Sequence, residues 1–154
     1  MPVPSASEVA RAHAESFSQA FARAAAEGRA AEGPENLDFV SEQAELTAPG
    51  GVSVHGREQR SDFYRAWADA FSDQHTEDEE EIVSGNTVVT ESTFTGRHTG
   101  VFRLRGLDIP PTGKGVRISY VSIQDVKRGK IVSTRLYFDR MEFLEQLSGT
   151  EYGK

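Results

Sequence analysis

The stretch that decides the fold spans residues 116–138 and reads VRISYVSIQDVKRGKIVSTRLYF. Its two halves, Val116–Val126 and Ile131–Phe138, follow a period of two between apolar and polar side chains, which is typical of β-strands. The linking residues 127–130 are polar with one glycine, and this composition favours a hairpin turn. The stretch therefore predicts an antiparallel pair of strands.

Two more strands are expected on its N-terminal side, at about Thr76–Val83 and Thr87–Gly96, joined by the turn-forming residues 84–86. A short strand is predicted at Glu45–Ala48. The link from Thr99 to Gly115 shows no regular pattern, and a loop of that length is more often functional or mobile than inert. The second half of the chain is thus predicted to be an antiparallel meander.

Helices are predicted at both ends of the chain. Over residues 5–27, Ser5 and Glu8 have the spacing of a capping box, and apolar residues then recur every three or four positions. At the other end, Asp139 opens a second capping box before an apolar face in residues 139–148. Asp139 is a helix cap in this interpretation, and a catalytic carboxylate is the alternative.

Two further helices are predicted between them, a short one from Pro34 through Val40 and an amphipathic one over Arg57–Ser72. The apolar face of the amphipathic helix consists of Phe63, Tyr64, Trp67, Ala70 and Phe71. The charged residues predicted to lie largely on its opposite, solvated face are Arg57, Glu58, Arg60, Asp62 and Asp69. Helices followed by an antiparallel meander predict an α+β fold, with a curved sheet wrapped around a helical layer.

Composition limits the available chemistry. The chain has 154 residues, 17 Lys and Arg against 24 Asp and Glu, a net charge of -7 and no cysteine. The length predicts one domain over residues 1–154, and the lack of cysteine excludes disulfides, thiolate metal sites and a cysteine nucleophile. The acidic balance lacks the basic surface that nucleic-acid binding needs, and no apolar run is long enough to span a membrane. We therefore expect a cytoplasmic protein that binds neither nucleic acid nor membrane.

Four short motifs follow one another along the chain: TGRHTG at 95–100, IPPTGK at 109–114, RGKI at 128–131 and LEQL at 144–147. With the order of the elements, they make the chain resemble the SnoaL-like polyketide cyclases, which belong to the nuclear transport factor 2-like superfamily. The resemblance implies a cone-shaped barrel, in which a strongly curved mixed or antiparallel sheet wraps around the N-terminal helices and encloses an apolar central pocket. It also implies a homodimer that forms through the outer face of the sheet.

The resemblance has consequences for the chemistry. The characterised members close a ring in an aromatic polyketide by intramolecular aldol condensation, without metal or organic cofactor, which implies a role in natural-product or antibiotic biosynthesis. An aspartate moves the proton in those members, and its position falls on Leu136 here. The family's Gln and His positions fall on Tyr120 and Ser122. Because leucine cannot transfer a proton, we expect shape to matter more than acid–base chemistry.

The residues predicted to be catalytic are His98, Tyr120 and Ser122. His98 ends a strand beside the long loop, where an imidazole can orient a carbonyl or exchange a proton near neutral pH; a structural histidine is the alternative. Tyr120 and Ser122 share one strand face and offer hydroxyl donors, and the alternative is a tyrosine packed in the core. The other three histidines share no ligand spacing, so no metal site and no cofactor are expected.

The residues predicted to line the substrate pocket are Tyr64, Trp67, Phe71, Phe94, Leu136 and Phe138. The predicted function is a metal-independent cyclase, of the lyase or isomerase type, that holds an apolar polyketide-type intermediate in a reactive fold. Such pre-organisation can supply ~7–11 kcal/mol of the barrier, which suits an intramolecular [4+2] closure or a conjugate addition. The alternatives are an epoxide hydrolase or epoxide-opening cyclase, and a non-catalytic protein that binds a small molecule.

Overall fold

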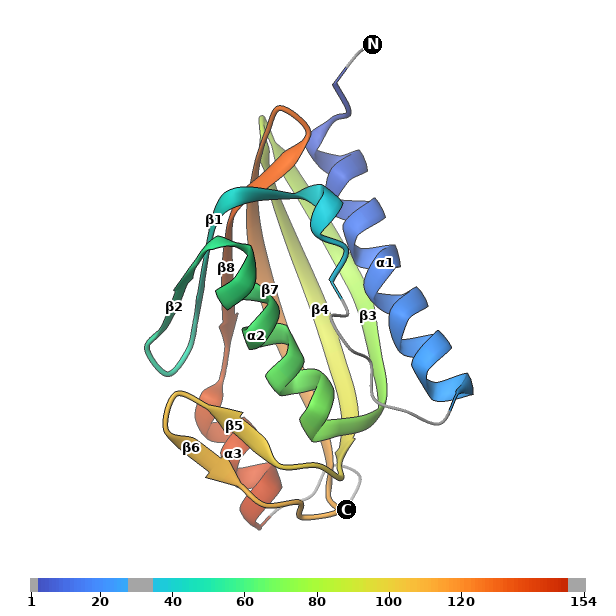
Figure 1. Cartoon of the computed structure of the whole chain (residues 1–154), viewed down its shortest axis with the longest axis vertical. Coiled ribbons are helices and arrows are strands. Elements are labelled where there is room, and N and C mark those ends of the chain that lie inside the picture. The colour runs from blue at the N-terminus through green and yellow to red at the C-terminus, as the bar shows by residue number, and fades with distance from the viewer. Residues whose placement is uncertain (1–2, 28–34, 150–154) are drawn as a thin grey trace.

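The computed structural model describes residues 3–27 and 35–149 and has the expected α+β architecture (Figure 1). Six strands form one mixed sheet in the order β2-β1-β8-β7-β4-β3. They are β1 (Val40–Ala48), β2 (Val52–His55), β3 (Phe71–Ser84), β4 (Thr87–His98), β7 (Gly115–Lys127) and β8 (Lys130–Phe138). The helices of this part of the chain are α1 (Ala6–Ala26), the single 3-10 turn η1 (Leu37–Phe39), α2 (Gly56–Ala70) and α3 (Arg140–Ser148).

The β7–β8 hairpin confirms the prediction made for residues 116–138. The two strands pair antiparallel, and Arg128 and Gly129 at their turn both have positive φ, 53° and 75°, as a two-residue primed turn requires. The other edge of β7 pairs with β4, and β4 pairs with β3, so the predicted meander is present. β1 joins β8 in parallel, and this single pairing makes the sheet mixed.

The helices cover the concave face of a curved, open sheet. In Figure 1, α1 runs alongside β3 and β4, and α2 lies in the hollow of the sheet. α3 lies with the small hairpin of β5 (Phe102–Leu104) and β6 (Leu107–Ile109) at the end opposite the β7–β8 turn. β2 and β3 are the free edges, and β3 is exposed over its acidic stretch 77–80. Sheet and helices thus enclose a cone-like interior.

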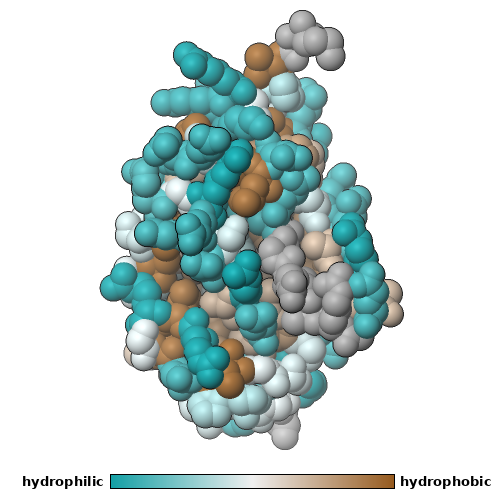
Figure 2. Space-filling view, in the orientation of Figure 1, coloured by the Kyte–Doolittle hydropathy of each residue, from teal (hydrophilic) through white to brown (hydrophobic). Residues whose placement is uncertain are grey.

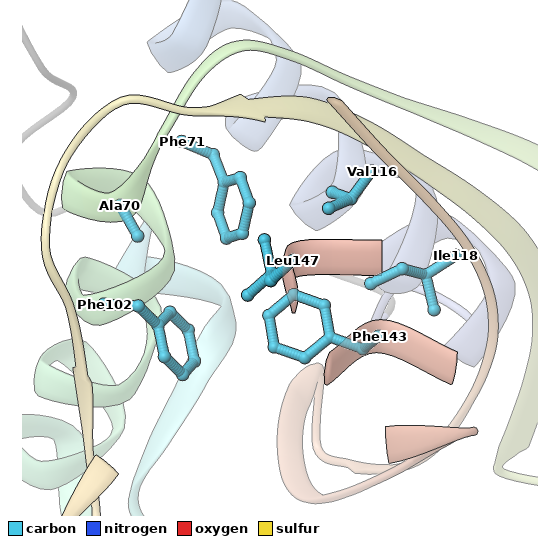
Figure 3. Packing of buried hydrophobic residues seen from close by; sticks show 7 residues of the cluster. All are labelled: Ala70, Phe71, Phe102, Val116, Ile118, Phe143 and Leu147. Carbon is cyan, nitrogen blue, oxygen red and sulfur yellow. The ribbon is translucent and has the colours of Figure 1, made fainter. Parts of the chain in front are cut away.

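The interior is aromatic where α3 closes it (Figure 3). The buried residues of this cluster are Ala70, Phe71, Phe102, Val116, Ile118, Phe143 and Leu147. The Phe143 ring of α3 lies 5.1 Å from Trp67, 6.0 Å from Phe71 and 5.5 Å from Phe102, measured between ring centroids. Because tilted and edge-to-face ring pairs add about 0.5–1.5 kcal/mol each beyond simple burial, these contacts fix α3 on the end of the sheet.

Four parts of the chain differ from the sequence prediction. One is the junction of α2 and β3, because Phe71 and Ser72 were predicted to be helical and are the first residues of β3. The helix predicted from Pro34 through Val40 is wrong within the described residues: only η1 forms, and Val40 already begins β1, while residue 34 lies outside them. β1 is accordingly longer than the predicted strand at Glu45–Ala48. β2 was not predicted, and neither was the β5–β6 hairpin in the long link. These strands have three or four residues, which is too short to show a periodicity.

Both predicted caps are present. The Asp139 carboxylate accepts a hydrogen bond from the backbone N–H of Glu142 at 3.0 Å, at the start of α3. The Ser5 hydroxyl accepts from the backbone N–H of Glu8 at 3.2 Å, at the start of α1. Asp139 therefore caps a helix, and its exposed carboxylate is directed to the helix backbone rather than to the interior.

No helix in the described residues has both the length and the apolar character needed to cross a membrane. The face shown in Figure 2 is mostly hydrophilic, and its hydrophobic residues form small groups between polar ones. The buried apolar side chains pack between the helices and the sheet.

Replacing Phe143 tests how much the aromatic cluster stabilises the fold. Phe143 is 2% exposed, so Phe143→Ala is expected to lower the free energy of unfolding by about 3–5 kcal/mol. Met141→Ala on the same helix is the matched control, because Met141 is 70% exposed and its loss should change stability by no more than about 0.5 kcal/mol. Urea unfolding followed by circular dichroism measures both, and similar losses for the two variants would contradict this description of the core.

Candidate active site

Helix α2 directs three polar-tipped side chains toward the concave face of the sheet. Arg60, Tyr64 and Trp67 are four and three residues apart, so they form one stripe along the helix. Tyr64 and Trp67 pack in one cluster with Leu46 of β1 and Leu136 of β8. The stripe therefore forms the helical wall of the interior.

Arg60 corrects the sequence prediction. The prediction that it lies on the solvated face of the helix is wrong, because the residue is 0% exposed. Its Nε donates to both carboxylate oxygens of Glu35, at 2.9 and 2.8 Å. The guanidinium carbon also lies 5.6 Å from the centre of the Tyr64 ring, within the range of a cation–π contact. A buried guanidinium persists only where such partners compensate its charge.

Glu35 joins Arg60 to helix α1. Its Oε2 lies 2.5 Å from Nε2 of His13, and both residues are buried. Burial by itself would raise the pKa of Glu35, but the hydrogen bond from His13 and the positive charge of Arg60 outweigh it, and the net pKa is lowered. The carboxylate is therefore ionised at neutral pH, and since an ionised carboxylate only accepts, the His13 Nε2 carries the proton. We call His13, Glu35 and Arg60 the buried ionic cluster.

The two terminal nitrogens of Arg60 are buried and have no hydrogen-bond partner in the described structure. The indole Nε1 of Trp67, further along the same stripe, is buried and unpartnered as well. Buried donors nearly always have partners in native proteins, so each exception calls for an explanation. These donors are the strongest structural indication that the interior receives a polar ligand.

On the sheet side, the structure brings together three positions that the family resemblance singled out. Tyr120 and Ser122 lie at two-residue spacing between the buried Ile118 and Gln124 along β7, so their side chains share the concave face with them. Ser122 lies directly opposite Leu136 of β8. Side chains opposite one another in an antiparallel pair share a face and make contact. Tyr120, Ser122 and Leu136 are thus neighbours.

The phenol of Tyr120 is held in its protonated form. Burial raises its pKa and the Asp78 carboxylate raises it further, while hydrogen bonding from Ser92 and Thr76 offsets part of this effect. Burial likewise raises the pKa of Tyr64. The nearby phenol of Tyr120 makes a further, smaller contribution to the raised pKa of Tyr64. Both phenols act as hydrogen-bond donors at neutral pH.

The six predicted pocket residues, Trp67 among them, lie in two adjoining apolar clusters that share Trp67. The Trp67 ring contacts the rings of Phe71, Phe94 and Phe138 at centroid distances of 5.7, 5.9 and 5.8 Å. Tyr64 and Leu136, like Trp67, pack against the neighbouring cluster of Leu46, Val52 and Phe63. These side chains pack against one another. A hollow of about 350 Å³ lies on the outside of the molecule, between the charged side of α2 and the chain leading to β5. Their role as pocket lining stays a prediction.

His98 lies apart from Tyr120 and Ser122. Ser92 pairs with Tyr120, and His98 follows six residues later on β4, which corresponds to about 20 Å along the strand. The residue is 0% exposed, and its Nδ1 accepts from the backbone N–H of Thr112 at 3.2 Å. Burial lowers the pKa of His98, and the Gly100 backbone offsets part of this shift. The imidazole is therefore neutral at pH 7 and bonded to the link between β6 and β7.

Sequence reasoning missed the buried ionic cluster as a set. Arg60 is four residues before Tyr64 and three before Phe63, so the helical period places it in the apolar stripe, and only its charge suggested solvent. Its partner Glu35 is distant in sequence and precedes a strand whose start was predicted too late. Within residues 3–27 and 35–149, His, Asp and Glu side chains form no group of three that could hold a metal ion.

Comparison with known proteins identifies relatives of this arrangement. The sequence profile of the SnoaL-like polyketide cyclases matches residues 19–147. No curated protein sequence gave a significant match. Solved structures share the fold at low sequence identity.

Three solved structures illustrate this likeness. A protein from Jannaschia sp. CCS1, assigned as a SnoaL-like polyketide cyclase, is 22% identical with a TM-score of 0.67, over 73% of this chain and 75% of its own. An NTF2-like protein of unknown function from Burkholderia pseudomallei K96243 is 17% identical with a TM-score of 0.66, over 90% and 97%. TerC, co-crystallised with polyporic acid, is 19% identical with a TM-score of 0.57, over 73% and 83%.

Neutralising Glu35 tests the buried ionic cluster. Glu35→Gln should lower the free energy of unfolding by about 3–5 kcal/mol at pH 7, because Arg60 then keeps an uncompensated buried charge. The folded-state pKa of Glu35 is lowered, so its stabilisation is present above the unfolded pKa and is lost as pH falls through the folded pKa. The difference between wild type and variant should therefore shrink in acid.

Urea unfolding at pH 7, 5 and 3 measures this difference. Glu42→Gln is the matched control, since Glu42 is exposed on β1 and its replacement should have little effect at any of these pH values. A stability difference for Glu35→Gln that stays constant down to pH 3 would show that folding does not lower the pKa of Glu35.

Proposed function

Since the chain belongs to the SnoaL-like polyketide cyclase family, we propose that it is a cofactor-independent cyclase that closes a ring in a polyketide-type natural-product intermediate. It does so mainly by holding the flexible substrate in a reactive fold between α2 and the concave face of the sheet. The reaction is of the lyase or isomerase type. Tyr120 and Ser122 supply hydrogen bonds, and the aromatic residues around Trp67 supply the apolar wall.

One observation carries this proposal. Ser122 and Leu136 face each other in register, with Tyr120 beside them, at the positions where the family resemblance implies acid–base residues. The position implied for the proton-transferring aspartate is thus occupied by a side chain that cannot ionise. A reaction that needs no proton transfer fits these residues better than an aldol condensation.

An intramolecular [4+2] closure meets this requirement. Two carbon–carbon σ bonds form from the π electrons of a diene and an alkene, and no proton, electron or leaving group enters or departs. The barrier is largely the entropy of bringing the two ends together, and a shaped site can supply ~7–11 kcal/mol of it. The protonated phenol of Tyr120 lowers the barrier further by donating to a carbonyl oxygen conjugated with the alkene.

The structure gives the predicted alternatives less support. Epoxide opening needs two convergent carboxylates, and both oxygens of Glu35 are already bonded to Arg60 and His13.

His98 is bonded to Thr112 at the far end of β4, so we give it a role in holding the loop rather than in catalysis. TerC was co-crystallised with polyporic acid, which supports small-molecule binding by this fold but not turnover.

The proposal includes a cytoplasmic homodimer that acts in natural-product biosynthesis. The outer face of the sheet would form the dimer contact, and Tyr137 of β8, which is 54% exposed, belongs to that face. Sedimentation equilibrium measures the oligomeric state. A monomer at all protein concentrations would contradict the proposed dimer and leave the proposed cyclase activity unaffected.

Cyclisation of a synthetic linear trienone tests the proposed reaction. The substrate carries a conjugated diene and an enone on one chain, and gas chromatography follows its conversion to the bicyclic ketone. Wild type should accelerate the closure with a rate that is constant between pH 6 and 9, because the raised pKa keeps Tyr120 protonated throughout this range. Tyr120→Phe should cost about 1.5–3 kcal/mol in the transition state, roughly 10- to 150-fold in kcat.

Tyr137→Phe is the matched control, since this tyrosine points away from the interior and its phenol should not affect the rate. A rate that rises with a single ionisation below pH 7 and survives in Tyr120→Phe would indicate a carboxylate or imidazole base instead. A trienone that binds to wild type without conversion would favour the non-catalytic alternative.

A further inference from the structure

The terminal nitrogens of Arg60 present a hydrogen-bonding face that nothing in the described structure occupies. Nε is committed to Glu35, which fixes the plane of the guanidinium and leaves both terminal nitrogens without a partner. The residue is 0% exposed, so bulk water does not satisfy these donors. A planar group with two hydrogen-bonding nitrogens matches the two oxygens of a carboxylate in a bidentate arrangement.

The surroundings of Arg60 favour an acid whose remainder is apolar. The guanidinium lies over the Tyr64 ring, and Trp67 of α2 and Leu136 of β8 pack against the same apolar cluster as Tyr64. The Trp67 indole N–H adds a further buried donor without an acceptor. Within the residues that the structure describes, Glu35 is the one acidic side chain bonded to Arg60, so a ligand with two oxygen acceptors can bond to the remaining donors without displacing it.

From this geometry we infer that Arg60 is the binding residue for the free carboxylate of an apolar substrate, with Glu35 and His13 as the residues that position it. The substrate is accordingly a released polyketide-type acid, not an ester or thioester held on a carrier. The carboxylate enters against Arg60, and the apolar chain extends past Tyr64 toward Tyr120 and the aromatic residues around Trp67. This inference rests on the proposed function for the nature of the chain, while the carboxylate site stands on Arg60 itself.

Binding of 2-naphthoate and of its neutral amide tests the site without any need for turnover. Isothermal titration calorimetry at pH 7 should show that wild type binds naphthoate at least about tenfold more tightly than naphthamide. Arg60→Lys keeps a positive charge beside Glu35 but lacks the paired nitrogens, so the preference for naphthoate should largely disappear. Unfolding of this variant is monitored in parallel to confirm that it is folded.

Arg65→Lys is the matched control. Arg65 lies on the exposed side of the same helix, pairs with Asp62 and lines the outer hollow together with Arg103. Its replacement should leave the naphthoate preference unchanged. Loss of the preference in Arg65→Lys, with Arg60→Lys unaffected, would mean that the anion binds on the surface.

Wild type itself provides a readout that does not depend on any variant. In protein labelled with nitrogen-15 arginine, naphthoate should shift the terminal nitrogen signals of one arginine, whereas naphthamide should not. Equal affinity for the two compounds, with unshifted arginine signals, would overturn the inference and indicate that water alone fills the space. Such a result would leave trienone cyclisation untouched, so failure of the carboxylate site and failure of the proposed reaction are distinguishable.

Discussion

Arg60 carries a positive charge into the interior, and Glu35 makes that burial tolerable. Taking one ion out of water costs several kcal/mol, so the guanidinium remains inside only because a carboxylate bonds to its Nε at 2.8–2.9 Å. Glu35 lies just before β1, His13 on α1 and Arg60 on α2. The same contacts therefore tie the first helix, the entry to the sheet and the second helix together. The position of the helical wall over the sheet depends on them.

This constraint gives the interior a polar end and an apolar end. The buried ionic cluster occupies one end of the α2 stripe, and the rings around Trp67 and Phe143 occupy the other. The phenols of Tyr64, on the same stripe, and of Tyr120, on β7, stay protonated because burial raises their pKa values. A flexible substrate with one charged terminus would place that terminus at the polar end and its apolar chain at the apolar end. Only one direction of binding is then favourable. Selecting one direction and one folded shape is what templated ring closure requires.

The sequence was sufficient for features that depend on local patterns. The period of two over residues 116–138 and the capping residues Ser5 and Asp139 predicted their elements, and the structure confirms them. Aromatic residues at helical spacing correctly predicted the apolar face of α2, where Phe63, Tyr64 and Trp67 pack in the interior. The prediction that Arg60 is exposed was wrong because the residue that compensates its charge, Glu35, lies 25 positions away in the sequence. Its charge, considered without that partner, predicts a solvent-exposed side chain. An ion pair between residues far apart in the sequence leaves no recognisable pattern in the residues next to either partner.

The most direct test of this account is a double-mutant cycle between Glu35 and Arg60. Unfolding free energies are measured for wild type, Glu35→Leu, Arg60→Met and the double variant. If the pair holds the helical wall in place, each single change leaves a buried charge unpaired, and the double variant is more stable than the sum of the two losses predicts. We expect a coupling energy of about 2–3 kcal/mol. Losses that add to within about 0.5 kcal/mol would contradict the central role given to this ion pair.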